Sequence, residues 1–171
     1  MREYGRRLRA TRAFAAARGW TLVDRARSDA ERQALLEQLH GEPFHPPERA
    51  PDAFPYPVLG RCEHRLSDVM RGTYRGRNVV VFAYTRRQEV LDDSFGRRGW
   101  ESSHYWIAAL LDLPDLTPMP LEDSDRRWRI SGTSLLTWTH QSAPGIPLDQ
   151  IDPALERLSV IAEHFTAPTG P

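Results

Sequence analysis

Lysine is absent from this chain of 171 residues, in which all 23 basic residues are arginine. The absence excludes Schiff-base chemistry through lysine, an internal pyridoxal phosphate linkage and the lysine of a phosphate-binding loop. The single cysteine, Cys62, excludes an internal disulfide and a zinc site built from several thiolates. The fold must therefore depend on its own hydrophobic core.

The chain also lacks long apolar runs and net charge. The longest apolar run, Tyr105 to Leu111, is far shorter than the roughly 20 residues that a membrane-spanning helix needs. The apolar stretch from Ala13 to Ala17 is too short for a signal peptide, so we expect a cytoplasmic protein without membrane insertion. The formal net charge of zero removes the general electrostatic attraction to nucleic acid.

Helix signals occur near both ends of the chain. Residues 4–18 and 28–41 have helical spacing of their apolar positions, and a glycine stands where each helix should end. A third helix over residues 150–166 begins with an Asp-Pro pair, which suits the first turn. Its predicted apolar face consists of Leu155, Leu158, Ile161, Ala162 and Phe165.

The middle of the chain is rich in β-branched and aromatic residues. Residues 78–85 are the clearest strand, and residues 62–74 should form a hairpin with it through a glycine-containing turn. Residues 104–113 predict a third strand, and residues 128–140 predict a last hairpin. Residues 90–103 contain two glycines and no periodicity, which indicates a long mobile loop.

These elements predict a single α+β domain spanning residues 1–171. An antiparallel sheet of about five strands, within residues 60–140, should pack against two N-terminal helices and one C-terminal helix. The predicted parts, in order, are a helical N-terminal part (1–41), a proline-rich strap (42–58), the sheet (59–140) and a closing helix (150–166).

Three motifs follow one another along the predicted sheet. They are a GTYRGR hairpin at residues 72–77, an HxxxxAxLxLP strand at 104–114 and a W-x-I-x-G-x-x-L-L-x-W hairpin at 128–138. Together with the closing helix, they resemble a family of small actinobacterial proteins of unknown function. The resemblance implies an architecture of turns, strand cores and a C-terminal helix. It implies no activity, cofactor or catalytic residue.

Candidate binding residues occur in two places. Arg97 and Arg98 are adjacent arginines, a type that binds carboxylates and phosphates, and the nearby Trp100 is of the type that often anchors an interface. Arg6 and Arg9 share one face of the first predicted helix, in an arginine-rich segment. That face suits RNA, lipid head groups or an acidic partner, or pairing with the acidic stretch of residues 112–125 of the same chain.

Metal and nucleophile chemistry have little support in the sequence. No two histidines have the one-turn spacing of a metal-binding helix, although His64, His104 and His140 would approach one another if their strands are neighbours. Cys62 and His64 are two residues apart on a strand, hence roughly 6.5–7 Å apart, which is too far for a direct hydrogen bond. We expect neither a bound metal nor a cofactor.

The sequence therefore favours a non-catalytic cytoplasmic module that binds another protein or a second copy of itself. Its partner should contact the arginine-rich helix and the 90–103 segment. Nucleic acid is disfavoured because the first helix offers few aromatic residues for base stacking. The alternative is a small-ligand-binding protein or enzyme with a pocket between sheet and helices, lined by Arg97, Arg98, His104 and His140.

Overall fold

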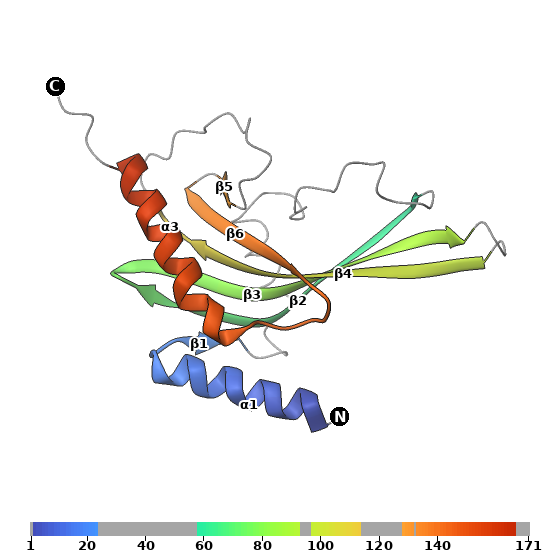
Figure 1. Cartoon of the computed structure of the whole chain (residues 1–171), viewed down its shortest axis with the longest axis horizontal. Helices are drawn as coiled ribbons and strands as arrows, with labels where there is room; N and C mark the ends of the chain where they lie inside the picture. The colour runs from blue at the N-terminus through green and yellow to red at the C-terminus, as the bar shows by residue number, and fades with distance from the viewer. Residues whose placement is uncertain (1, 24–57, 93–96, 114–127, 132, 167–171) are drawn as a thin grey trace.

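The computed structural model describes residues 2–23, 58–92, 97–113, 128–131 and 133–166. Figure 1 shows a curved sheet crossed on one face by α3, with α1 beside the edge formed by β1. In chain order the elements are α1 (Arg2–Ala17), β1 (Thr21–Leu22), β2 (Val58–Tyr74), β3 (Arg77–Asp92), β4 (Arg97–Leu110), β5 (Trp128–Ser131), β6 (Ser134–Gln141), the short 3-10 helix η2 (Leu148–Gln150) and α3 (Ile151–Thr166).

The sheet is antiparallel throughout, in the order β1-β2-β3-β4-β6-β5. This confirms the predicted α+β class with an antiparallel sheet, although the sheet has six strands because the two-residue β1 joins its edge. The first and last predicted helices correspond to α1 and α3. The helix predicted over residues 28–41, and the strap up to residue 57, lie outside the described residues.

The central strands β3 and β4 are buried on both faces, which is why their sequences are apolar at nearly every position there. Alternate residues of each strand point to opposite faces and build two separate cores. The helix-side core contains Met70, Val79, Val81, Ala83, Trp106, Ala108, Leu110 and Leu135 of the sheet with Ile151, Ala154, Leu155, Leu158 and Ala162 of α3. The opposite-face core contains Leu66, Val69, Val80, Phe82, Tyr84, Ile107, Ala109, Leu111 and Leu136.

The predicted apolar face of α3 is confirmed. Leu155, Leu158 and Ala162 are buried against the sheet, and Ile161 and Phe165 pack beside them. A polar contact fixes the crossing of the helix over the sheet: the hydroxyl of Tyr74 donates to Glu156 Oε2 over 2.9 Å. The Arg75 guanidinium reaches the same oxygen at 2.9 Å. The helix is therefore attached to the β2–β3 turn as well as to the core.

The turn between β2 and β3 occupies Arg75 and Gly76, as the glycine-containing hairpin predicted. Both residues have positive φ, 51° and 75°, which is the geometry of a two-residue turn that matches the twist of the strands. The β2 ladder is interrupted by a register shift between Ser67 and Met70. Gly72 therefore does not mark the bulge that a glycine inside a strand indicates.

Gly72 instead makes room for Trp20. A Cβ placed on Gly72 would stand 2.0 Å from Cδ1 of the Trp20 indole, so the ring lies directly on the strand backbone. The indole Nε1 donates to the carbonyl of Thr73 over 3.0 Å, and Phe14 of α1 packs edge-on against the ring. This contact holds the N-terminal helix to the sheet.

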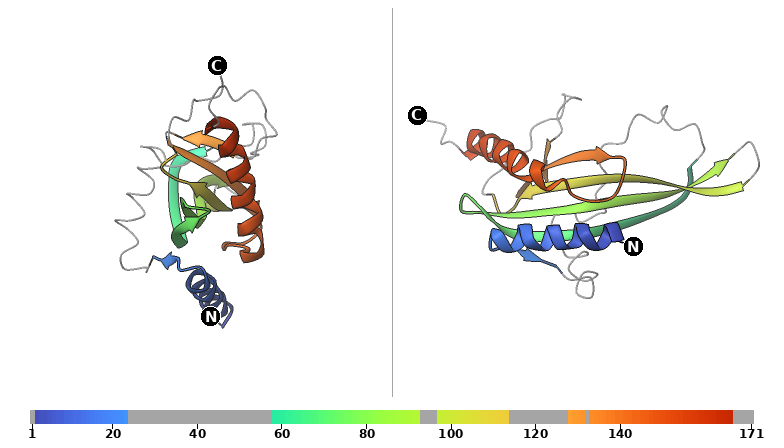
Figure 2. Two further views of the ribbon diagram at one scale, coloured as in Figure 1. Left: turned by 90° about the vertical axis from the view of Figure 1, so that its left-hand side faces the viewer. Right: turned by 60° about the horizontal axis from the view of Figure 1, so that its bottom comes forward.

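The prediction of a loop over residues 90–103 was wrong for residues 90–92 and 97–103, which belong to strands, whereas residues 93–96 lie outside the described residues. β3 and β4 stay paired without a register shift from Val79–Leu110 to Asp92–Arg97, and they extend beyond both helices (Figure 2). We call this extension, from Thr85 to Asp92 of β3 and from Arg97 to His104 of β4, the arm. Of the arm side chains that the structure describes, none belongs to either core, and the segment accordingly lacks the apolar pattern by which strands are recognised.

Neither α1 nor α3, the two α-helices in the described part of the chain, is long and apolar enough to cross a bilayer.

Replacing Gly72 with alanine tests the contact with Trp20. The added methyl group would collide with the indole, so we expect the free energy of unfolding to fall by about 2 kcal/mol or more. Gly5→Ala in α1 is the matched control, because a Cβ at Gly5 would meet no atom of the described residues within 4 Å and alanine favours helices. Urea denaturation of both variants measures the difference, and equal stabilities would contradict the described packing.

Candidate interaction surfaces

Trp100 lies on β4 within the arm, on the same face of the sheet as α3. The strand alternation that buries Trp106 in the helix-side core also brings His104, Ser102 and Trp100 to this face. The side chain of Trp100 is exposed, with 40% of its surface accessible, whereas Trp20 and Trp106 are buried. Trp100 is therefore exposed, as the sequence predicted. It lies on a strand, and the backbone pairing of that strand with β3 fixes its position.

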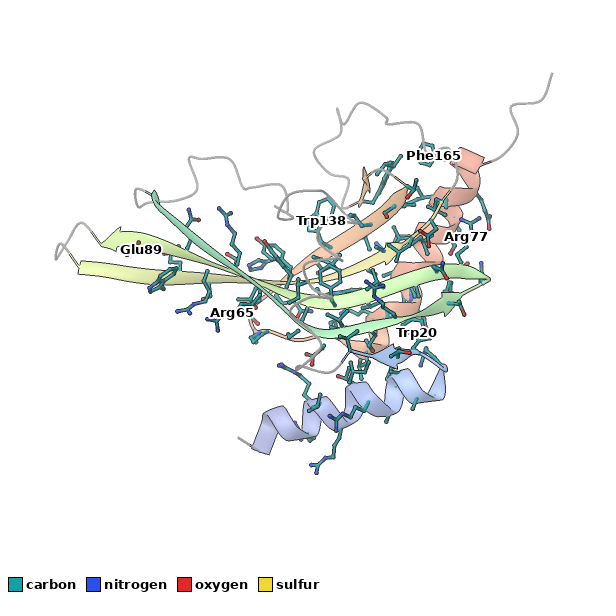
Figure 3. The ribbon with its side chains drawn as sticks, turned by 180° about the vertical axis from the view of Figure 1, so that it is seen from behind. Trp20, Arg65, Arg77, Glu89, Trp138 and Phe165 are labelled. Atoms are coloured by element: carbon teal, nitrogen blue, oxygen red, sulfur yellow. The ribbon has the colours of Figure 1, made fainter. Side chains whose placement is uncertain are left out.

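Arg87 of β3 lies over the Trp100 ring, with its guanidinium carbon 5.1 Å from the ring centroid. Such a stack is a cation–π interaction, and it presents an aromatic surface next to a positive charge. Glu89 stands directly opposite Trp100 in the ladder and is buried. Figure 3 shows Glu89 on the projecting end of the sheet, far from Trp20 and α1.

Arg97 and Arg98 begin β4, where their backbones pair with Asp92 and Leu91. They therefore stand on the same strand as Trp100, at the far end of the arm. The structure describes their backbone position, and their side chains lie outside the described residues.

His104 and His140 occupy opposite faces of the sheet. His104 lies on the α3 side, and its Nδ1 is 3.0 Å from Oγ1 of Thr85. His140 lies on the other side, where its ring packs edge-on against Tyr105 with centroids 5.2 Å apart. The structure therefore does not bring the two imidazoles into one site.

Burial lowers the pKa of His104 below its ordinary value, and the nearby His140 lowers it further. The lowered pKa favours the neutral imidazole, which is a hydrogen-bonding partner of Thr85. The side chains of Cys62 and His64 lie outside the described residues. In the ranges that the structure covers, no three His, Cys, Asp or Glu side chains are grouped as a metal would need.

The arginines whose side chains the structure describes in α1 and in the turn that follows it divide into two groups. Arg6, Arg9 and Arg12 are exposed on the outer side of the helix, and the sequence has no acidic residue between Gly5 and Val23. Arg7 and Arg18 instead turn toward the body of the protein and pair with Asp68 and Asp152. The predicted basic face with Arg6 and Arg9 is therefore the part of the helix that solvent reaches.

Asp68 of β2 is a buried carboxylate that contacts Arg7 of α1. It has φ of 54° within the β2 register shift, and its side chain is 6% exposed. Its Oδ2 lies 3.7 Å from Arg7 Nη2 and accepts no hydrogen bond from the described part of the chain. Burial raises the pKa of Asp68, and the positive charge of Arg7 offsets only part of that rise. Arg7 also donates to the Pro144 carbonyl, which links α1 to the segment before α3.

Arg87 and Asp68 were not identified from the sequence. The position of Arg87 over Trp100 follows from the register of β3 against β4, which a residue pattern does not reveal. The role of Asp68 follows from a register shift, and aspartate is one of the few residues that tolerate positive φ. That preference is the one signal in the sequence that marks this position.

Comparison of the chain with protein-family models, curated proteins and solved structures finds no match. The resemblance to the small actinobacterial proteins stays a prediction.

Asp68→Asn should stabilise the protein at neutral pH. A carboxylic acid whose pKa is raised by folding is destabilising when it ionises, so the penalty is absent at low pH and grows as the pH rises through the raised pKa. Asparagine keeps the shape and the tolerance of positive φ while removing the charge. We expect a Tm increase of a few degrees at pH 7 that disappears in acid.

Asp68→Ala is the control for this prediction. It also removes the charge, but alanine is disfavoured by about 1–2 kcal/mol in the left-handed region. Thermal melts between pH 3 and pH 8 should therefore show Asn above Ala at every pH. A wild type that is more stable than Asp68→Asn at pH 7 would show that the Arg7 pair outweighs desolvation.

Proposed function

We propose that the protein is a non-catalytic cytoplasmic interaction module whose arm binds another protein. The observation that carries the proposal is the exposed Trp100 with Arg87 stacked on its ring. Tryptophan and arginine are the residue types that most often dominate binding energy at protein interfaces. The arm presents Arg87 on β3 and Trp100 on β4, two paired strands whose backbones are already ordered, which lowers the entropy lost on binding.

The outer face of α1 supplies a second, electrostatic contact. Arg6 and Arg9 are exposed, while the arginines that face the body have acidic partners within the protein. An acidic region on a partner would complement this face and speed association without adding much affinity. The two surfaces contribute to binding in different ways. Trp100 provides apolar area that becomes buried in the interface, and α1 provides positive charge.

The alternative of a ligand pocket lined by Arg97, Arg98, His104 and His140 has less support. Its two histidines face opposite sides of the sheet, so one small molecule would not contact both. The arrangement favours a binding surface over an enclosed site.

Trp100→Ala should weaken partner binding strongly. Truncating an interface tryptophan typically costs about 2 kcal/mol or more, which is roughly a 30-fold loss of affinity. The measurement is quantitative mass spectrometry of proteins captured from a cell extract by the tagged chain, compared with the variant. The matched control is Val160→Ala on α3, the other large exposed apolar side chain in the described ranges, which is 49% exposed.

The proposal predicts a set of captured proteins that Val160→Ala retains and Trp100→Ala loses. Both variants should keep the wild-type melting temperature, because both side chains are exposed. Equal capture by the two variants would refute a role for the Trp100 surface.

A further inference from the structure

One edge of β4 is open along the arm. β6 pairs with β4 only from His104 to Leu110, so the stretch from Arg97 to Ser103 has β3 on one side and, in the described part of the chain, no strand on the other. Unpaired N–H and C=O groups along a strand edge form a template for another strand. The open stretch is long enough for a regular five-residue pairing.

The outer edge of β2 is a poorer template, although β1 pairs with it at only two positions. β2 shifts register between Val58 and Cys62 and again between Ser67 and Met70. Such irregularities bend a strand and protect its edge from pairing. β4 has no register shift against β3 along its whole length, so its open edge keeps the regular spacing that a second strand requires.

We propose that the open edge of β4 pairs with the same edge of a second copy of this chain, antiparallel and centred on Gly99. A two-fold axis perpendicular to the sheet relates two such strands, so the pairing must be centred on a single residue. The two arms then form one continuous sheet. This inference rests on the proposed function and deepens it by naming a second copy as a partner at the Trp100 surface.

The charges of the residues on either side of Gly99 favour a pairing centred on this residue. With Gly99 opposite Gly99, Arg97 lies opposite Glu101 of the second copy, and the two-fold axis repeats the pair. Directly opposite residues of antiparallel strands contact one another, and opposite charges there are stabilising. Centring on Glu101 would place two carboxylates face to face, and centring on Trp100 would place Glu101 opposite glycine.

The same centre places Arg98 opposite Trp100 of the second copy. The Trp100 ring has Arg87 of its own chain against it, so the aromatic surface at this position is already one that accepts a cation. Glycine at the centre adds no side chain that would keep the strands apart. Each end of the short interface therefore has Arg97 in register with Glu101 and Arg98 in register with Trp100.

The arm projects away from the two helices in the described part of the chain. The right view in Figure 2 shows the described strands of the arm extending past α1 and α3. The two-fold axis keeps the α3-side faces on the same side of the joined sheet. Both Trp100 side chains then lie on one shared face.

A charge swap in the full chain tests the pairing. Sedimentation velocity over a wide concentration range should show a monomer–dimer equilibrium for the wild type. Arg97→Glu and Glu101→Arg should each weaken dimerisation about tenfold, because each places like charges at two symmetric positions. The double variant Arg97→Glu/Glu101→Arg should restore dimerisation. Arg157→Glu, an exposed arginine on α3 with the same change in charge, should leave it unchanged.

A wild type that stays monomeric at every concentration overturns the proposal, and so does a double variant as weak as the single ones. Equal weakening by Arg157→Glu would show a general charge effect and would overturn it too. Circular dichroism melts identify any variant that fails to fold. A monomer that still captures proteins through Trp100 would refute the dimer and leave the proposed function intact, so the two failures are distinguishable.

Discussion

Burial of β3 and β4 on both faces is the constraint on which the rest of the structure depends. Val80 and Val81 are adjacent in sequence, yet each is fully buried in a different core. The pairing of β3 with β4 positions the side chains of both cores. α3 can therefore pack on the sheet only where the residues of the helix-side core are correctly in register. The arm continues this ladder beyond the cores, so the position of Trp100 is determined by apolar packing that lies several residues away along the same strands.

The sequence pattern identified helices and strands where burial in a core imposes a regular spacing of apolar residues. The apolar run of residues 78–85 predicts a strand because both of its faces are buried, and the spacing of Leu155, Leu158 and Ala162 predicts the face of α3 that meets the sheet. The pattern failed at residues 90–92 and 97–103, where β3 and β4 extend beyond the cores. Backbone pairing that continues from the buried part of the ladder forms these ends of the two strands, and hydrogen bonds to a neighbouring strand leave no periodic trace in side-chain type.

The candidate surfaces could be predicted to different degrees. Trp100, Arg6 and Arg9 follow from residue type, because a tryptophan between polar residues and an arginine-rich helix face stand out in any sequence. The stack of Arg87 on Trp100 requires the register of two strands. The burial of Asp68 requires a register shift and a neighbouring helix, both of which are properties of the tertiary structure.

The contacts of α1 also have a consequence for biosynthesis. Arg18 meets Asp152 across a separation of 134 residues, and Arg7 meets Pro144 across 137. Because α1 is synthesised before Pro144 and Asp152, these tertiary contacts form only after the intervening residues have been made. Contacts this distant close slowly, since a long loop must be ordered before they form. Until then the nascent chain carries an arginine-rich helix whose inward-facing charges, Arg7 and Arg18, have not yet met these partners.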